Sequence, residues 1–244
     1  MDDKTPLIEV ENLSKIFGLL PVLRSVSFGV ARGETIMLLG QNGSGKSTLL
    51  RLLAGLSKPT AGVLRIGGWQ MPEEAMAVRR QIGLVSHQPL LYGNLSAREN
   101  LDFFGKLYGM ARDERGEAIG ALLDQVGLAT RADSLARDFS RGMQQRLSIA
   151  RALLHQPEIL LLDEPFTGLD QAAAETLEEL VKSAGREKRT LIMTTHQLGR
   201  APTLAGRALI LARGRIAFDG NIKTMSAAGL GELYARLCGG AAVA

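Results

Sequence analysis

The sequence predicts an α/β fold, in which a mostly parallel sheet is covered by helices, preceded by antiparallel β-strands and interrupted by an inserted all-helical subdomain. Three observations predict it. From residue 35 onward, short apolar runs alternate with helical stretches, the pattern of parallel sheets covered by helices. The residues before this point have the alternating or β-branched pattern of strands. Between Pro89 and His155 the strand pattern stops, and only helices are expected.

The elements follow in chain order. Residues 7–13 and 22–30 are expected to be strands, and the turn at 31–34 leads into the parallel sheet. Its strands are expected at 36–39, 63–66, 82–85, 159–163, 191–194 and 208–211, with helices at 46–54 and 171–184. In the insertion, Ser96 and Glu99 form a capping box that begins a helix reaching Tyr108. Further helices are expected over 113–126, ended by Gly127, and over 142–154.

Length and composition place the chain among ordinary globular proteins. It has 244 residues, 45% hydrophobic and 22% charged, and its 29 Lys and Arg against 25 Asp and Glu give a net charge of +4. This composition excludes disordered, collagen-like and disulfide-scaffold proteins. The small and scattered excess of positive charge disfavours nucleic-acid binding. Glycine, at 28 residues, is in excess, which indicates segments where the backbone approaches a partner closely.

The sequence predicts no membrane span. Its longest uninterrupted apolar runs are about five residues, far below the ~18–20 that a bilayer requires. The amino terminus, MDDKTPLIEVEN, lacks the basic start and apolar core of a signal peptide. The single cysteine, Cys238, excludes an intramolecular disulfide, and the absence of CxxCH excludes covalent haem. We therefore expect a chain that stays in the cytosol.

Residues 40–48 match the phosphate-loop pattern GxxxxGK[ST] in full. The pattern lies between a predicted strand and a predicted helix, the flanks that it requires. Glycines let backbone N–H groups turn inward around phosphate oxygens, while Lys46 would reach the β- and γ-phosphates and Ser47 would hold Mg²⁺. A plain Gly-rich turn is disfavoured, because a lysine in the first helical turn is unfavourable beside the positive end of the helix dipole unless an anion is bound. The predicted nucleotide-binding residues are Gly40, Gln41, Asn42, Gly43, Ser44, Gly45, Lys46, Ser47 and Thr48.

A second candidate site ends the strand predicted over residues 159–163. Asp163 and Glu164 follow four apolar residues, a pattern that alone fits a core strand reaching the surface equally well. With a phosphate loop in the same chain, Asp163 is the expected Mg²⁺ partner at the carboxyl end of a neighbouring strand. Glu164 is expected to orient the attacking water and to accept its proton.

The segment FSRGMQQR at residues 139–146 resembles the LSGGQ signature of ATP-binding cassette (ABC) ATPases, and together with the two sites above the resemblance covers nearly the whole chain. It departs from the commonest pattern at Phe139, Arg141 and Met143, and keeps Ser140 and Gly142. The resemblance implies an ATP hydrolase in which Ser140 and Gly142 bind the γ-phosphate held by an opposite subunit. Ser140 also stands where a helix N-cap belongs, and a helix N-terminus favours an anion. A plain capped surface helix is the alternative.

Four further residues take their roles from the resemblance. Gln88 is implied to sense Mg²⁺ and water and to link the catalytic core to the transporter, and His196 to contact the γ-phosphate. An exposed loop amide and a satisfied imidazole are the alternatives. Asp170 is implied to act in communication between the subunits of a dimer, although it would also cap the next helix. Phe17 is implied to stack on adenine, with a core phenylalanine as the alternative.

The resemblance also implies a domain organisation and partners. Residues 1–88 and 156–244 would form a RecA-like core with an N-terminal β-subdomain, and residues 89–155 a helical subdomain that carries the signature. Since the signature acts on another subunit's nucleotide, the chain is expected to form a nucleotide-dependent dimer, most simply with itself. Transport would require separate transmembrane permease subunits, which places the chain peripherally on the cytoplasmic face of the cell membrane.

Within the family, residues 86–101 and the segments FSRGMQQRLSIARALL, LLLDEPFTGLD and TTHQ resemble the ATPase of the haem exporter used in cytochrome c maturation. That resemblance implies ATP-driven export of haem or release of a haem-loaded chaperone, although no residue identifies a haem site. The ATPase of another exporter, for drugs, lipids or polysaccharides, is the first alternative. A soluble ABC ATPase acting on DNA or ribosomes is disfavoured by the single compact cassette. A regulator without hydrolysis is disfavoured by the intact Lys46, Asp163, Glu164 and His196.

Overall fold

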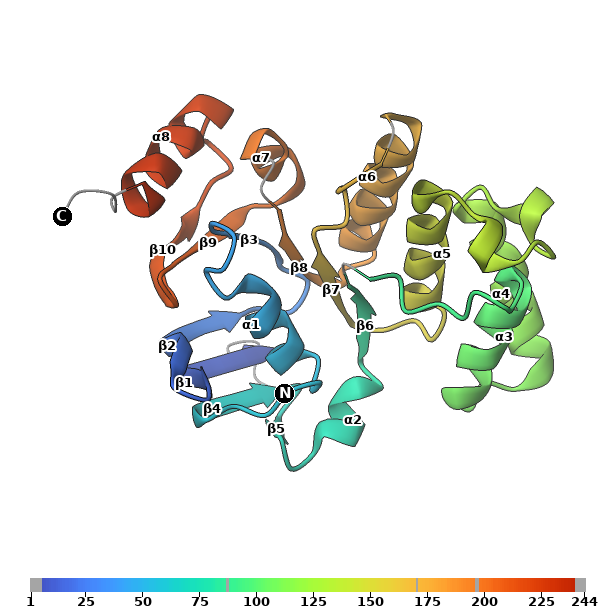
Figure 1. Ribbon diagram of the computed structural model, residues 1–244, viewed down its shortest axis with the longest axis horizontal. Coiled ribbons are helices and arrows are strands. Elements are labelled where there is room, and N and C mark those ends of the chain that lie inside the picture. Colours follow the sequence, from blue (N-terminus) through green and yellow to red (C-terminus); the bar gives the residue numbers. More distant parts are fainter. Residues whose placement is uncertain (1–5, 87, 170, 196–197, 240–244) are drawn as a thin grey trace.

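The computed structural model describes residues 6–86, 88–169, 171–195 and 198–239, which form two sheets and the helices around them (Figure 1). The larger sheet has six strands in the order β10-β9-β3-β8-β7-β6. Its strands are β3 (Thr35–Leu39), β6 (Ile82–Val85), β7 (Ile159–Asp163), β8 (Thr190–Thr194), β9 (Arg207–Ala212) and β10 (Arg215–Asn221). All neighbours pair in parallel except β9 and β10, which pair antiparallel. The predicted α/β fold with a mostly parallel sheet is confirmed.

The smaller sheet is antiparallel and has the order β2-β1-β4-β5. It contains β1 (Ile8–Phe17), β2 (Leu20–Val30), β4 (Ala61–Ile66) and β5 (Trp69–Met71). The sequence analysis assigned residues 63–66 to the parallel sheet, which is wrong: β4 pairs antiparallel with β1, with Ile8 opposite Ile66. A short apolar run shows that a strand is buried, but it does not show which sheet receives it.

Two apolar clusters cover the two faces of the larger sheet. Because successive side chains of a strand point to opposite faces, Ile36 and Leu38 join one cluster, while Met37 and Leu39 join the other. The first cluster contains the antiparallel sheet and helix α1 (Lys46–Leu53). The second contains α6 (Gln171–Arg186), α8 (Ala227–Cys238) and the helices of the insertion. The sheet is therefore buried on both faces, as a parallel sheet requires.

Between β6 and β7 the described residues form helices, turns and one isolated β-bridge, between Ser96 and Leu135. The helices are α3 (Ala97–Leu107), α4 (Arg112–Gln125) and α5 (Arg141–Leu153), with 3₁₀ turns at Ala129–Arg131 and Ala136–Asp138. The predicted capping box is confirmed, since the Glu99 N–H donates to the Ser96 hydroxyl over 3.1 Å and the Ser96 N–H donates to the Glu99 carboxylate over 2.7 Å. These helices lie together at one side of the molecule, beyond β6 and β7 (Figure 1).

Several elements lie outside the predicted ones. They are β5, α2 (Ala75–Arg79), a 3₁₀ turn at Leu198–Arg200, α7 (Ala201–Leu204), β10 and α8. Strand β10 has alternating exposed and half-buried residues because it lies at the edge of the larger sheet. Over the described residues, no helix is long and apolar enough to span a bilayer.

Candidate functional site

The carboxyl ends of the parallel strands meet at one edge of the larger sheet, where α/β folds bind their ligands. The predicted phosphate loop follows β3, Asp163 ends β7, and Gln88 follows β6. Strand β8 lies between β3 and β7. Asp163 is therefore not on a strand next to the phosphate loop, as the sequence analysis expected, but two strands away. The end of β8 consequently lies between the two predicted sites.

At two positions of the phosphate loop, Gly40 and Gly45, the surroundings leave no room for a side chain. Gly45, at φ +108°, would place a Cβ 2.8 Å from a methyl carbon of Leu23 on β2. At Gly40 a Cβ would lie 2.4 Å from the Leu211 carbonyl oxygen of β9. The loop is thus packed between the antiparallel sheet and β9, directly before helix α1. This strand, loop and helix arrangement presents N–H groups and the positive end of a helix toward an anion.

Lys46 is buried in the first turn of α1, only 7% exposed, although it carries a positive charge. Its ammonium donates to the Gly40 and Gln41 carbonyl oxygens over 2.7 and 3.1 Å. Burial lowers the pKa of Lys46, while the carboxylates of Glu164 and Asp163 oppose that shift. The structure therefore brings the phosphate-loop lysine and the two predicted acids into one site. A cation held this way needs an anionic partner, which a triphosphate supplies.

Thr194, at the end of β8, connects the two acids and was not anticipated. Its hydroxyl donates to the Asp163 carboxylate over 2.7 Å and accepts a hydrogen bond of 2.8 Å from the Glu164 N–H. Glu164 has a left-handed backbone with φ +50°, unusual for a residue other than glycine, and such strain is concentrated at functional sites. Thr194 thereby fixes the position of Asp163 and the turn that presents Glu164. The signal in the sequence was a threonine at the end of a buried strand.

Helix α5, which contains most of the signature segment, is hydrogen-bonded to two loops that carry predicted site residues. The Gln145 amide donates to the Pro165 carbonyl oxygen over 3.2 Å, directly after Glu164. Ser148 donates to the Pro89 carbonyl oxygen over 3.1 Å, directly after Gln88. Gln88 itself is exposed, and its carbonyl oxygen accepts a hydrogen bond from the Ser86 hydroxyl. A movement of α5 would therefore be transmitted to both the acid-bearing loop and the glutamine loop.

Ser140 caps α5 as predicted, accepting a hydrogen bond of 3.3 Å from the Met143 N–H, although the helix begins at Arg141 rather than at Gly142. Ser140 is exposed and Gly142 half-buried. A Cβ at Gly168 would lie 2.8 Å from the Arg141 Nε, so the loop before α6 packs against the start of the signature helix. Helix α5 lies beyond β6 and β7, whereas α1 lies beside the antiparallel sheet (Figure 1). Ser140, at the start of α5, and Lys46, at the start of α1, are therefore presented by different helices.

Phe17, at the end of β1, is 51% exposed, with the Lys15 ammonium 4.7 Å from its ring centre. The alternative of a core phenylalanine is therefore wrong. The hairpin partner β2 carries Leu23, which contacts Gly45 of the phosphate loop. An exposed aromatic ring can offer an apolar face to a base. His196 and Asp170 lie outside the described residues, so their predicted roles stay predictions.

The oxygen donors at the sheet edge suit Mg²⁺. Ser47 is exposed in the first turn of α1, and Asp163 presents a carboxylate held by Thr194. Hydroxyl and carboxylate oxygens are the ligands that Mg²⁺ prefers alongside phosphate. No cluster of three or more His, Cys, Asp or Glu side chains occurs among the described residues.

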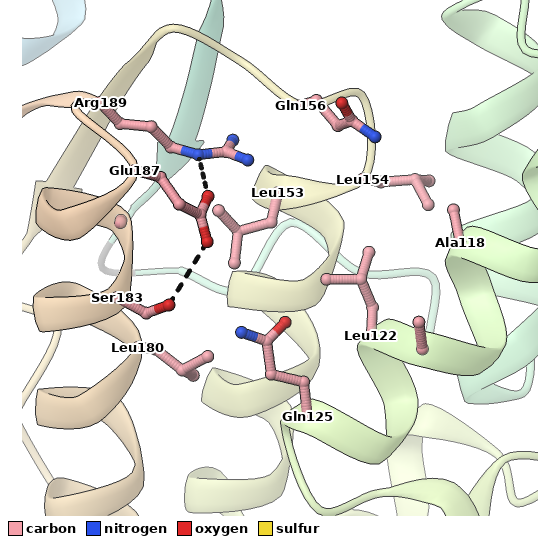
Figure 2. A pocket seen from close by; sticks show the side chains of 12 residues that line it. Ala118, Leu122, Gln125, Leu153, Leu154, Gln156, Leu180, Ser183, Glu187 and Arg189 are labelled. Carbon is pink, nitrogen blue, oxygen red and sulfur yellow. Dashed lines mark hydrogen bonds and ion pairs between the residues drawn. The ribbon is translucent and has the colours of Figure 1, made fainter.

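A separate cavity of about 330 Å³ lies between α4, α5 and α6 (Figure 2). Leu122, Leu153 and Leu180 line it, together with an ion pair of 2.9 Å between Arg189 and Glu187. The predicted site residues do not line it. It marks the groove where the inserted helices meet the core, away from the phosphate loop.

Comparison with known proteins identifies the family. A family model described as "ABC transporter" matches residues 23–167. The chain is 35% identical over 210 residues to the linearmycin resistance ATP-binding protein LnrL of Bacillus subtilis, covering 86% of this chain and 68% of that one. It is 36% identical over 224 residues to the Nod factor export ATP-binding protein I of Paraburkholderia xenovorans, covering 92% and 74%.

Two solved structures agree with the fold. An ATP-binding subunit of an ABC transporter superposes with a TM-score of 0.87 at 33% identity, covering 95% of this chain and 99% of that one. A dimeric ATP-binding cassette in a post-hydrolysis state, bound to ADP and Pi, superposes with a TM-score of 0.82 at 28% identity, covering 88% and 98%.

Proposed function

This chain belongs to the ABC transporter family as an ATP-binding and ATP-hydrolysing subunit, and we propose that it powers an exporter whose membrane-spanning part is made by separate subunits. One observation carries the proposal most directly. The buried Lys46 ammonium lies on the phosphate loop and within the electrostatic influence of Asp163 and Glu164, at the carboxyl edge of the sheet. Phosphate binding, metal binding and activation of water can therefore occur at one place.

The roles follow from the chemistry of these groups. The N–H groups of residues 40–48 and the Lys46 ammonium would hold the β- and γ-phosphates, and Phe17 would stack on the adenine. Ser47 and Asp163, with Gln88, would hold Mg²⁺, which supplies charge neutralisation on the phosphates when bound. Glu164 would orient the attacking water and accept its proton, while His196 would contact the γ-phosphate. The Thr194 hydroxyl would fix the positions of Asp163 and Glu164 relative to each other.

We further propose that a second subunit completes the site. Ser140 and Gly142 begin helix α5, whose N–H groups and positive end favour an anion. They belong to the inserted helices, residues 89–155, whereas Lys46 belongs to the core formed by residues 1–88 and 156–244. In a dimer of two copies, one chain's Ser140 and Gly142 would close on the nucleotide held by the other, and Asp170 would lie at the contact between subunits. The dimeric cassette with ADP and Pi supports such an arrangement.

The transported molecule is proposed from the relatives. One is named for Nod factor export and another for linearmycin resistance, so export of a small organic molecule such as a drug, lipid or polysaccharide is the better supported function. Neither name concerns haem, and haem export for cytochrome c maturation stays a prediction. Membrane subunits captured with the tagged chain from detergent extracts distinguish them. Cytochrome c assembly subunits would identify the haem exporter, and an unrelated permease would exclude it.

The proposed catalytic role is tested by Glu164→Gln in the purified chain. This change keeps the size and polarity of the side chain and removes the base, so we expect ATP hydrolysis to fall by about 10²–10⁴-fold while ATP binding persists. Glu175→Gln, an exposed glutamate on α6, is the matched control. Undiminished hydrolysis in Glu164→Gln would remove Glu164 as the base.

A further inference from the structure

The last turn of α8 lies against the phosphate loop, although some 200 residues separate them along the chain. The Gln41 side-chain amide donates to the Cys238 carbonyl oxygen over 3.0 Å. Gln41, Asn42 and Ser44 line a cavity of about 250 Å³ together with Leu237 and Cys238. The end of the helix and the loop therefore form the two walls of one space.

Two side chains of α8, Tyr234 and Cys238, lie within the electrostatic influence of the catalytic groups. Burial raises the pKa of the Cys238 thiol, and the positive charge of Lys46 opposes that shift. Burial raises the pKa of Tyr234 as well, with smaller contributions from Cys238 and from the carboxylate of Glu164. The charges of Lys46 and Glu164 therefore act on side chains in the last turns of α8.

This arrangement opposes a bound triphosphate. The carboxyl end of a helix carries about half a negative charge, and the carbonyl at the end of α8 faces a loop built to receive phosphate. The Lys46 ammonium donates to the Gly40 and Gln41 carbonyl oxygens. The Ser44 hydroxyl, which lines the same cavity, is buried without a hydrogen-bond partner in the described structure. In this conformation the phosphate loop packs against the end of α8, and the Ser44 hydroxyl of the loop makes no hydrogen bond within the described structure.

We propose that the last turn of α8 is a latch on the nucleotide site, held by Gln41 and displaced when ATP binds. The latch keeps the Cys238 carbonyl oxygen against Gln41 of the phosphate loop. An isolated chain without nucleotide is therefore restrained, and ATP binding and release of α8 are coupled. This inference rests on the proposed ATP site.

Cys238 provides a direct readout, because it is the only cysteine of the chain. The rate of its alkylation by iodoacetamide is measured by intact-protein mass spectrometry in the double variant Glu164→Gln/Gly142→Asp. Glu164→Gln is chosen to prevent hydrolysis, and Gly142→Asp to prevent closure by a second subunit. ATP binding is measured on the same samples by equilibrium dialysis with Mg²⁺. The latch predicts that ATP accelerates alkylation of Cys238. Bound ATP with an unchanged or slower rate overturns the latch alone, whereas failure to bind ATP in the otherwise native chain overturns the proposed function as well.

A second variant tests the attachment without nucleotide. Gln41→Ala removes the hydrogen bond to Cys238, so we expect alkylation to become about fivefold faster, the equivalent of one typical hydrogen bond. Gln70→Ala, at an exposed glutamine on β5 outside this cavity, should leave the rate unchanged. Equal rates in Gln41→Ala and the parent would contradict the proposal. Circular dichroism on each variant verifies that the fold is retained.

Discussion

The phosphate-loop edge and the inserted helices use buried polar side chains in opposite ways. In the insertion, Asn100 is completely buried and fully bonded: its amide donates to the Tyr92, Leu95 and Ser96 carbonyl oxygens over 3.0, 3.1 and 2.9 Å, and its carbonyl accepts from the Tyr92 N–H over 2.8 Å. At the phosphate loop, Lys46 is nearly as buried, but its ammonium has only two backbone carbonyls and the field of two carboxylates.

The difference distinguishes buried polar groups that stabilise the fold from buried polar groups that bind a ligand. A buried polar group with all its partners inside the chain stabilises one conformation, whereas one with partners missing is stable only if a ligand supplies them. Arg115 follows the first pattern, since its guanidinium donates to Asp102 over 2.6 Å and to the Met110 carbonyl oxygen over 2.8 Å. The unpartnered Ser44 hydroxyl follows the second. Substitutions in the two regions should consequently change different measurements.

The largest effect is expected at Lys46. Lys46→Ala removes charge-assisted hydrogen bonds to phosphate, so ATP binding should weaken about 10–100-fold, with hydrolysis lost accordingly. Folding stability should change little, because the same substitution also removes the cost of burying the charge. Titration with a fluorescent ATP analogue measures the affinity. Arg51→Ala, an exposed cation on the same helix, is the control, and equal affinities in the two variants would show that the loop does not bind phosphate.

A reverse pattern is expected at Asn100. Asn100→Ala leaves buried backbone groups of residues 92–96 without partners, at a cost of about 1–3 kcal/mol. Urea unfolding should show this loss, while the affinity for ATP should stay unchanged. The exposed Asn94, changed to alanine, should alter neither quantity appreciably. If Asn100→Ala instead weakened ATP binding at unchanged stability, the division between the two regions would be incorrect.

His155 gives the smallest effect and lies where the inserted helices meet the amino end of β6. Its ring stacks on that of Tyr108, the residue after α3, with 3.7 Å between the ring centres, and its Nε2 lies 3.2 Å from the Ile82 carbonyl oxygen of β6. Burial lowers the pKa of His155 from 6.5 to about 4, with the nearby Arg151 and Arg189 contributing. As the pH falls below about 6.5, the His155 imidazole therefore becomes protonated in the unfolded chain but stays neutral in the folded chain. Stability is full above that pH and declines as the pH falls toward about 4.

Between pH 7 and 5.5 this decline amounts to about 1 kcal/mol. His155→Phe retains an aromatic ring beside Tyr108 and removes the titration, so its free energy of unfolding should depend less on pH in this range. Urea unfolding at several pH values measures the dependence. Identical slopes in His155→Phe and the unchanged chain would contradict the assigned pKa shift.

The sequence predicted most of what local patterns determine. Residues 159–163 form a buried strand with the predicted bounds, and the capping box at Ser96 begins α3 where expected. The phosphate loop and the two acids are recognisable because each role requires particular residue types at fixed spacing. These features depend on neighbours along the chain, which a single sequence displays.

Features that depend on distant segments were missed. The partner of β4 is β1, some fifty residues earlier, and no local pattern in residues 61–66 specifies it. Thr194 acquires its role only because β8 inserts between β3 and β7. The contact between Gln41 and Cys238 likewise has no signature in either segment.

The central claim is that one chain holds half of each catalytic site, and the mass of the chain in solution tests it most directly. Glu164→Gln, mixed with ATP and Mg²⁺, should change from a monomer of 26.2 kDa to a species of twice that mass by light scattering. Gly142→Asp in the same background should bind ATP and stay monomeric. A Glu164→Gln chain that binds ATP with Mg²⁺ and remains at 26.2 kDa at every protein concentration would contradict the account.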